Sequence, residues 1–274
     1  IETGASWLIA LRPIFEGGVE GVLSPPTLVF ASAAEACLRL HAGLAERLSG
    51  TARQHFESAT EDPYYLVWNV ALLKELYANP RESARHALVT ALLGGRGERF
   101  ISLLPTSEFG RVVSHEWGHY VTNGIYGDAA FFRFPGGSHQ GHREAASREL
   151  AFSEDLATFF GQWGAGTGFP EQAGSMAGRW RDHARHPEDF EDGVAQCWPN
   201  RPGLDASRVE SIAATVLSCL ARDCGFERVY GVIAAGKPMN LLEFMQAWFA
   251  ACKPGDAAIG RLQYACTDAG LNWR

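Results

Sequence analysis

The sequence has no apolar run long enough to cross a membrane and no excess of positive charge. Its longest apolar runs, such as residues 212–220, fall well short of the roughly 20 residues that a spanning helix needs. Lysine and arginine number 24 against 31 aspartates and glutamates, which gives a net charge of −7. This charge disfavours nucleic acid and anionic membranes as main partners. We therefore expect neither a membrane span nor a nucleic-acid partner.

An initiator methionine, a charged and apolar leader and a Cys-x-x-Cys pair are also missing. A chain that opens at Ile1 predicts a processed protein whose export signal has been removed. The lack of Cys-x-x-Cys excludes the usual signature of a thiolate zinc site. Six cysteines, five of them in the last third, favour disulfides in a secreted or periplasmic protein. Six buried thiols in a cytosolic protein are the alternative.

Residues 113–120 contain the pattern His-Glu-x-x-His, formed by His115, Glu116 and His119. Positions i and i+4 of a helix lie on one face, so both imidazoles can bind one Zn²⁺ while the glutamate reaches a water on the metal. The alternative is a chance occurrence of these letters on an ordinary helix. The surrounding sequence has to decide between the two.

Apolar runs bounded by glycine and proline predict short strands at residues 7–11 and 27–30, and a third strand at 99–104 directly before the motif helix. The motif helix is expected to begin at Thr106 or Ser107. Other helices are expected at 32–48, 62–77, 81–93, 147–160, 175–185 and 189–198, after capping boxes at Ser207 and Asn240, and at about 256–269.

This order of elements predicts an α+β fold that is mostly α. We expect one catalytic unit built from two lobes. The first lobe, residues 1–163, contains a small N-terminal sheet, the motif helix and the helix that follows it. The second lobe, residues 164–274, is helical.

A catalytic zinc ion takes three protein ligands and leaves one position for water, so a third ligand is required. The three-histidine pattern HExxHxxGxxH is excluded, because Thr122 stands where glycine is needed and no histidine follows at that spacing. Glu154 lies in the next strongly apolar helix, beside Asp155. A buried carboxylate is costly unless it meets a cation or a metal. Glu154 is therefore the predicted third ligand, and exposure on a helix edge is the alternative.

The motif helix and the run EDLATFF at residues 154–160 together resemble the gluzincins, the family of thermolysin, aminopeptidases and collagenases. The resemblance covers about residues 102–161. It departs at Asp155, where glycine is commoner, and at Thr158, where thermolysin-like members place an aspartate that orients a zinc histidine. It implies a two-lobed zincin-like fold with the metal helix at the floor of a cleft, and a zinc-dependent peptidase that acts on a peptide or protein.

In such a peptidase, zinc makes its bound water acidic, and Glu116 takes the proton and passes it to the leaving amine. The oxyanion needs a further donor, commonly tyrosine or histidine in this family. The first candidates for this donor are Tyr126 and His142, because they flank the motif helix and the helix that contains Glu154. Further candidates are His139 and Tyr230. For His139 and His142 the alternative is a solvated, glycine-rich loop.

Two other functions compete with peptide hydrolysis. One is an inactive or zinc-stabilised binding domain of the same fold. The presence of Glu116 argues against it. A purely structural zinc site is also more often closed by four Cys or His ligands. The other is an ordinary helical protein in which the motif is fortuitous.

Overall fold

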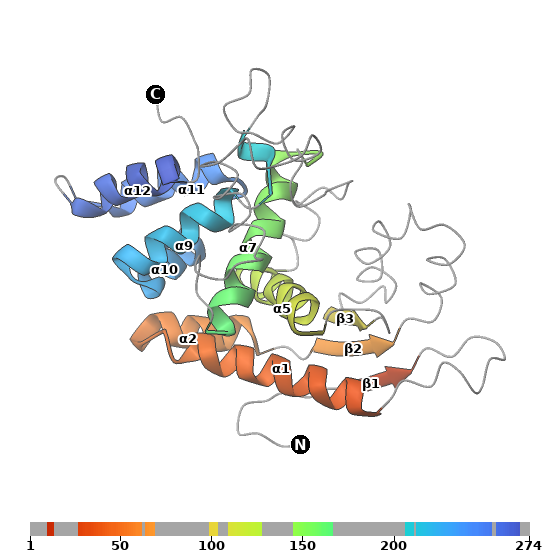
Figure 1. Ribbon diagram of the computed structural model, residues 1–274. Helices are drawn as coiled ribbons and strands as arrows, with labels where there is room; N and C mark the ends of the chain where they lie inside the picture. Colours follow the sequence, from red (N-terminus) through yellow and green to blue (C-terminus); the bar gives the residue numbers. More distant parts are fainter. Residues whose placement is uncertain are drawn as a thin grey trace.

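A computed structural model describes residues 10–13, 27–61, 64–68, 99–103, 109–127, 145–166, 206–210, 212–253 and 256–268. Most of these residues are α-helical (Figure 1). The helices are α1 (Thr27–Ala45), α2 (Gly50–Ala59), α5 (Phe109–Tyr126), α7 (Arg148–Gly164), the 3₁₀ helix η4 (Ala206–Arg208), α9 (Ile212–Cys224), α10 (Phe226–Gly236), α11 (Leu241–Ala251) and α12 (Ala257–Asp268). No helix in these ranges is both long and apolar enough to cross a membrane.

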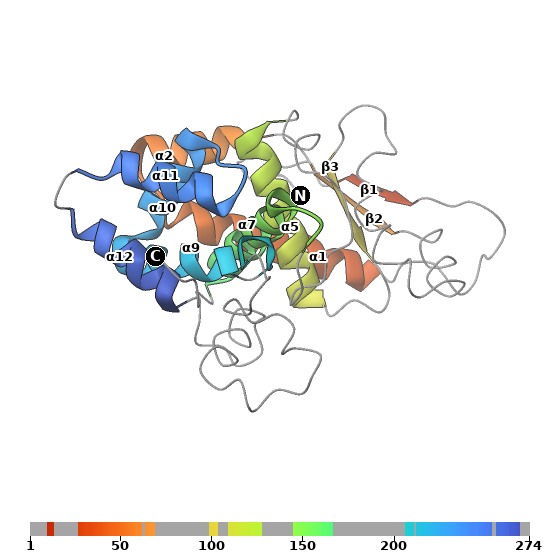
Figure 2. The same ribbon diagram turned by 90° about the horizontal axis from the view of Figure 1, so that it is seen from above.

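Three short segments are extended: β1 (Ala10–Pro13), β2 (Tyr64–Trp68) and β3 (Arg99–Leu103). They pair in parallel in the order β1-β2-β3, with Tyr65 opposite Ala10 on one side and Phe100 on the other. Both views place them at one side of the helices, next to α1 and α5 (Figures 1 and 2).

Helix α7 lies at the centre of the molecule. Its side chains are buried almost without interruption, and a helix that is buried on all sides has to be surrounded by other elements. Helices α1, α5 and α9 all pack against it (Figures 1 and 2). Ser147 caps its first turn, because the Ser147 side chain accepts a hydrogen bond from the Leu150 amide at 3.0 Å. The helix that carries the predicted third ligand is therefore held on several sides.

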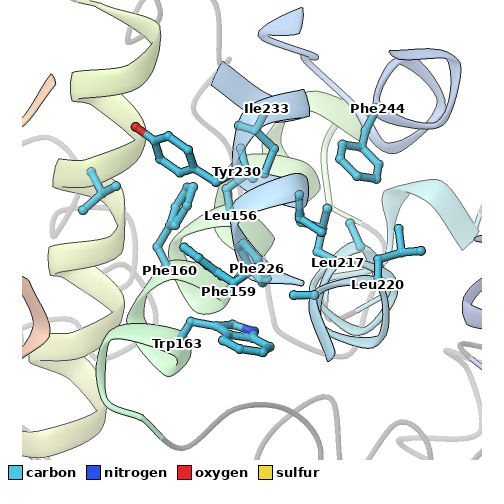
Figure 3. Close-up of a cluster of buried hydrophobic side chains, with 14 of the residues drawn as sticks. Leu156, Phe159, Phe160, Trp163, Leu217, Leu220, Phe226, Tyr230, Ile233 and Phe244 are labelled. Atoms are coloured by element: carbon cyan, nitrogen blue, oxygen red, sulfur yellow. The ribbon is translucent and has the colours of Figure 1, made fainter. Parts of the chain in front are cut away.

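A cluster of buried hydrophobic side chains, many of them aromatic, joins the second half of α7 to α9 and α10 (Figure 3). Phe226 stacks on Phe159 and on Trp163, with ring centroids 5.5 and 5.3 Å apart. Full burial of one such side chain contributes about 1.5–3 kcal/mol. The C-terminal helices therefore fix the position of α7. The division into lobes at residues 163 and 164 stays a prediction.

The predicted α+β fold class is wrong, because strands make up only the three short segments β1, β2 and β3 of the described residues. The described part of the chain is predominantly helical, and residues 27–30, expected as a strand, form the first turn of α1. The buried positions Ala33, Cys37, Leu40 and Leu44 recur every three or four residues, as on one face of a helix, and α1 begins before them at Thr27. Four apolar residues read alone do not distinguish a strand from a buried helix.

Other boundaries also differ from the expectations. Residues 64–68, expected within a helix, form β2, in keeping with the strand preference of their aromatic and β-branched side chains. The helix expected at 147–160 continues to Gly164, with Gly161 inside it, and the helix expected after the capping box at Ser207 begins at Ile212. The capping box at Asn240 is confirmed, since its side chain accepts from the Glu243 amide at 3.0 Å. The helices expected at 81–93, 175–185 and 189–198 lie outside the described residues.

Candidate metal centre

His115 and His119 on α5 meet Glu154 on α7. Glu154 Oε2 lies 3.0 Å from His115 Nε2 and 3.3 Å from His119 Nε2. One possible ligand atom from each of the three side chains lies within 4.8 Å of the other two. The Glu154 side chain is only 5 % exposed, while the two histidines are half-buried. We call these three residues the His-His-Glu group.

Glycines bring the two helices close enough for these side chains to meet. A Cβ atom at Gly118 would lie 2.0 Å from the carbonyl oxygen of Ala157, and one at Gly161 would lie 2.4 Å from that of Ser114. Both distances are far below van der Waals contact, so the backbones of α5 and α7 touch here. Gly118 thus permits a close approach of the two backbones. Gly161, one turn further along α7 than Ala157, has the same role.

The His115 ring is also held from the side that faces away from Glu154. Its Nδ1 atom lies 3.1 Å from the hydroxyl oxygen of Thr158, one turn after Glu154 on α7. If Nε2 is to offer its lone pair to a metal, Nδ1 carries the ring proton and donates it to this hydroxyl. Thr158, which departs from the thermolysin pattern, therefore still places a hydrogen-bond acceptor beside a candidate metal ligand.

Asp155 has a different partner from its neighbour Glu154. Its Oδ2 atom accepts a hydrogen bond from the Ala213 amide at 2.8 Å, at the N-terminus of α9. Asp155 is 2 % exposed, and a carboxylate is stabilised at a helix N-terminus by the unpaired amides and the helix dipole. The two adjacent acids of α7 thus have different roles. Glu154 contacts the histidines, and Asp155 connects α7 to α9.

The charges of the group are strongly coupled. Burial alone would lower the pKa of His119, but the Glu154 carboxylate, with smaller effects from Glu116 and Glu210, raises it to about 9. Burial would raise the pKa of Glu154, yet the two histidines hold it well below its usual range. Without a metal, the group is therefore an ion pair around a protonated His119. A bound cation would replace that proton.

The geometry and the donor types both fit a metal ion. In a tetrahedral zinc site with bonds of about 2.0–2.2 Å, neighbouring ligand atoms lie roughly 3.3 Å apart. The two distances from Glu154 Oε2, 3.0 and 3.3 Å, are close to this value. Two imidazoles and one carboxylate are also a ligand set of catalytic zinc, which keeps a further position for water. A buried His-His-Glu group of this kind could bind a metal ion.

Glu116 is near the group, whereas the candidate oxyanion donors that the structure describes are not brought to it. Glu116 stands between the two histidines in the sequence of α5, and its side chain is half-buried. Its charge helps to raise the pKa of His119. The Tyr126 hydroxyl donates to the Pro238 carbonyl at 2.6 Å, and burial raises the pKa of this tyrosine. The Tyr230 hydroxyl lies 2.8 Å from His55 Nδ1. Tyr126 would have to leave Pro238 to serve the metal centre.

His142, predicted as a further catalytic residue, and His139 lie outside the described residues, as does Cys197. The roles predicted for Tyr126 and His142 stay predictions.

Sequence reasoning did not assign the partners of Thr158 and Asp155. The spacing could have indicated the contact between Thr158 and His115, because Thr158 follows Glu154 by four residues and so lies on the same helix face. The hydrogen bond between Asp155 and Ala213 has no local signal in the sequence. Ala213 is distant from Asp155 along the chain, and its approach depends on how α9 packs on α7. No family model, curated protein or solved structure matches this chain, so its function has to be argued from the site itself.

Proposed function

We propose that this chain is a zinc-dependent peptidase. The observation that carries the proposal is the convergence of His115, His119 and Glu154 from two helices, with Glu116 placed between the histidines in the sequence. A fortuitous motif on an ordinary helix gives no reason for a buried carboxylate to lie 3.0 and 3.3 Å from both imidazoles.

In the proposed reaction, a bound zinc ion supplies Lewis acidity, which polarises a carbonyl and makes a water molecule easier to deprotonate. His115, His119 and Glu154 hold the ion. Glu116 accepts the proton of the attacking water and delivers it to the leaving amine. Thr158 would keep the His115 ring in the tautomer that leaves the Nε2 lone pair free to bind the ion.

The proposed family is the gluzincins, in which a glutamate on a second helix completes the site. The contact between Thr158 and His115 supports this placement, because it occupies the position at which thermolysin-like members use an aspartate. Asp155 also has a reason to replace the commoner glycine, since it binds the amide of Ala213. These two departures are compatible with the ligand set, and they point away from a close thermolysin homologue.

The experiment is a digest of a mixed peptide library by the zinc-loaded protein and by Glu116→Gln. This substitution removes the base but leaves the three ligands, so zinc binding should be retained while hydrolysis falls by at least about 100-fold. Zinc affinity measured on both proteins serves as the control. If both proteins bind zinc and both leave the library intact, the peptidase proposal is wrong, and a zinc-stabilised binding domain becomes the better description.

A further inference from the structure

Helix α7 presents different faces to its neighbours. One face meets α5 at a spacing of three or four residues, at Glu154, Ala157, Thr158 and Gly161. Asp155 lies outside this row. Successive residues of an α-helix are about 100° apart around its axis, so Asp155 is directed at a different neighbour, α9.

The hydrogen bond between Asp155 and α9 is short and buried. Asp155 Oδ2 accepts from the Ala213 amide at 2.8 Å, and Asp155 is 2 % exposed. Ala213 is the second residue of α9, where backbone amides have no partner within the helix. Helix α9 is itself held in the core, because it packs against α7, α10 and α12 and every residue from 212 to 221 is buried. Asp155 is therefore bonded to a fixed part of the molecule.

The other contacts of α7 define its rotation less strictly. Gly118 and Gly161 determine how closely α5 and α7 approach. The stacking of Phe226 on Phe159 is an apolar contact, and the hydrophobic effect has no preferred direction. A hydrogen bond has a preferred length and angle, so the bond from Ala213 resists a rotation of α7 about its own axis.

A small rotation of α7 would disturb the His-His-Glu group. The end of a side chain lies roughly 5–6 Å from the helix axis, so a rotation of about 5° moves it by about 0.5 Å. A metal site tolerates errors of only about 0.2 Å in its ligand distances. Because Glu154 directly precedes Asp155, the bond that holds Asp155 on α9 also holds the direction in which Glu154 leaves the helix.

We propose that Asp155 is a positioning residue of the metal centre, which keeps Glu154 aligned with His115 and His119 by fixing the rotation of α7 against α9. The inference rests on the proposed zinc site. Asp155 acts through Glu154 and contacts neither the metal nor the substrate. Loss of a hydrogen bond that supports metal ligands typically weakens metal binding about 10–100-fold. Asp155 acts one residue away from the ligand, so we expect the lower end of this range.

The test compares zinc affinity, by competition with a chelator, in wild type and in variants of Asp155. Asp155→Ala removes the acceptor, so the affinity should fall about tenfold. The absorption bands of the cobalt-substituted protein should shift, because Glu154 moves relative to the histidines. Asp155→Asn keeps an oxygen that can accept from the Ala213 amide, and it should restore most of the affinity.

Asn240→Ala is the matched control. It also removes a side-chain acceptor at a helix N-terminus, but on α11, which carries no ligand of the group. Its zinc affinity and its cobalt spectrum should be those of wild type. If Asp155→Ala does not fold, Asp155→Ser takes its place with the same expected loss, because the serine hydroxyl can bond to its own helix but is shorter than the carboxylate.

Three results would overturn the inference while the zinc site stands. Asp155→Ala could bind zinc as tightly as wild type with the same cobalt spectrum, which would leave Asp155 a purely structural role. Asn240→Ala could reproduce the loss, which would make it a general effect of lower stability. Asp155→Asn could lose as much affinity as Asp155→Ala, which would assign the effect to the charge and not to the hydrogen bond. A wild-type chain that binds no zinc would refute the proposed function, and this inference with it.

Discussion

Replacement of Gly118 by alanine tests whether the close approach of α5 and α7 creates the metal centre. The added methyl carbon would lie 2.0, 2.6 and 2.7 Å from the O, C and Cα atoms of Ala157. Since these are backbone atoms, no side-chain rotation can relieve the overlap. The helices would have to move apart by more than about 1 Å to restore ordinary contact, and such overpacking costs about 1–3 kcal/mol.

The same movement would separate His119 on α5 from Glu154 on α7. Metal–ligand distances tolerate errors of only about 0.2 Å, so a shift of this size should lower zinc affinity by more than about tenfold. The assay is chelator competition for zinc, together with thermal unfolding of the metal-free protein. Helix propensity opposes the overpacking by up to about 1 kcal/mol, because alanine is the better helix former.

Gly231→Ala provides the matched control. A Cβ atom at Gly231 on α10 has no neighbour within 4 Å, so this variant should gain about 0.5–1 kcal/mol in helix stability without a change in zinc affinity. If Gly118→Ala instead unfolds at the same or a higher temperature than wild type and binds zinc equally well, the reasoning about the helix contact is refuted.

Three further predictions concern the surroundings of the group. Thr158→Val should weaken zinc binding about 10–100-fold and Thr158→Ser should restore it, because only the hydroxyl holds His115; equal affinities in chelator competition would contradict this. Asp155→Ala should lower the free energy of unfolding by about 1–2 kcal/mol in a urea titration, since it removes the acceptor at the start of α9; an unchanged midpoint would count against that role. In metal-free protein, the stabilising effect of His119 should be complete below pH 6.5 and disappear as the pH rises through about 9, while that of Glu154 is complete above pH 4.5 and disappears as the pH falls. Melting curves of wild type and His119→Gln should therefore differ most at mildly acidic pH and converge above about pH 9, and a gap that persists at high pH would show that the pair does not form.

The sequence predicted the meeting of His115, His119 and Glu154 better than it predicted the fold. The helical spacing of His115 and His119, and a carboxylate within an apolar helix, are local signals that the packing of α5 on α7 did not override. Residues 27–30 and 64–68 were misread because a run of four or five apolar residues fits a strand or a buried helix equally well, and only packing decides between them.

The longer-range parts of the site could not be predicted. The bond from Ala213 to Asp155 joins residues that are distant in sequence, and neither position indicates the other. Gly161 illustrates the same limit. A glycine near the end of an apolar run usually terminates a helix, but here α7 continues to Gly164, and the missing side chain of Gly161 makes room for the Ser114 carbonyl. Such roles depend on which elements pack together.

The most direct test of the account is the zinc content of wild type and Glu154→Gln after identical loading and removal of unbound metal. The account predicts about one zinc ion per wild-type chain and a large loss of zinc in the variant, with the far-ultraviolet circular dichroism of both proteins unchanged. A wild-type chain without zinc, or a Glu154→Gln variant that retains as much as wild type, would contradict the claim that His115, His119 and Glu154 form one metal centre.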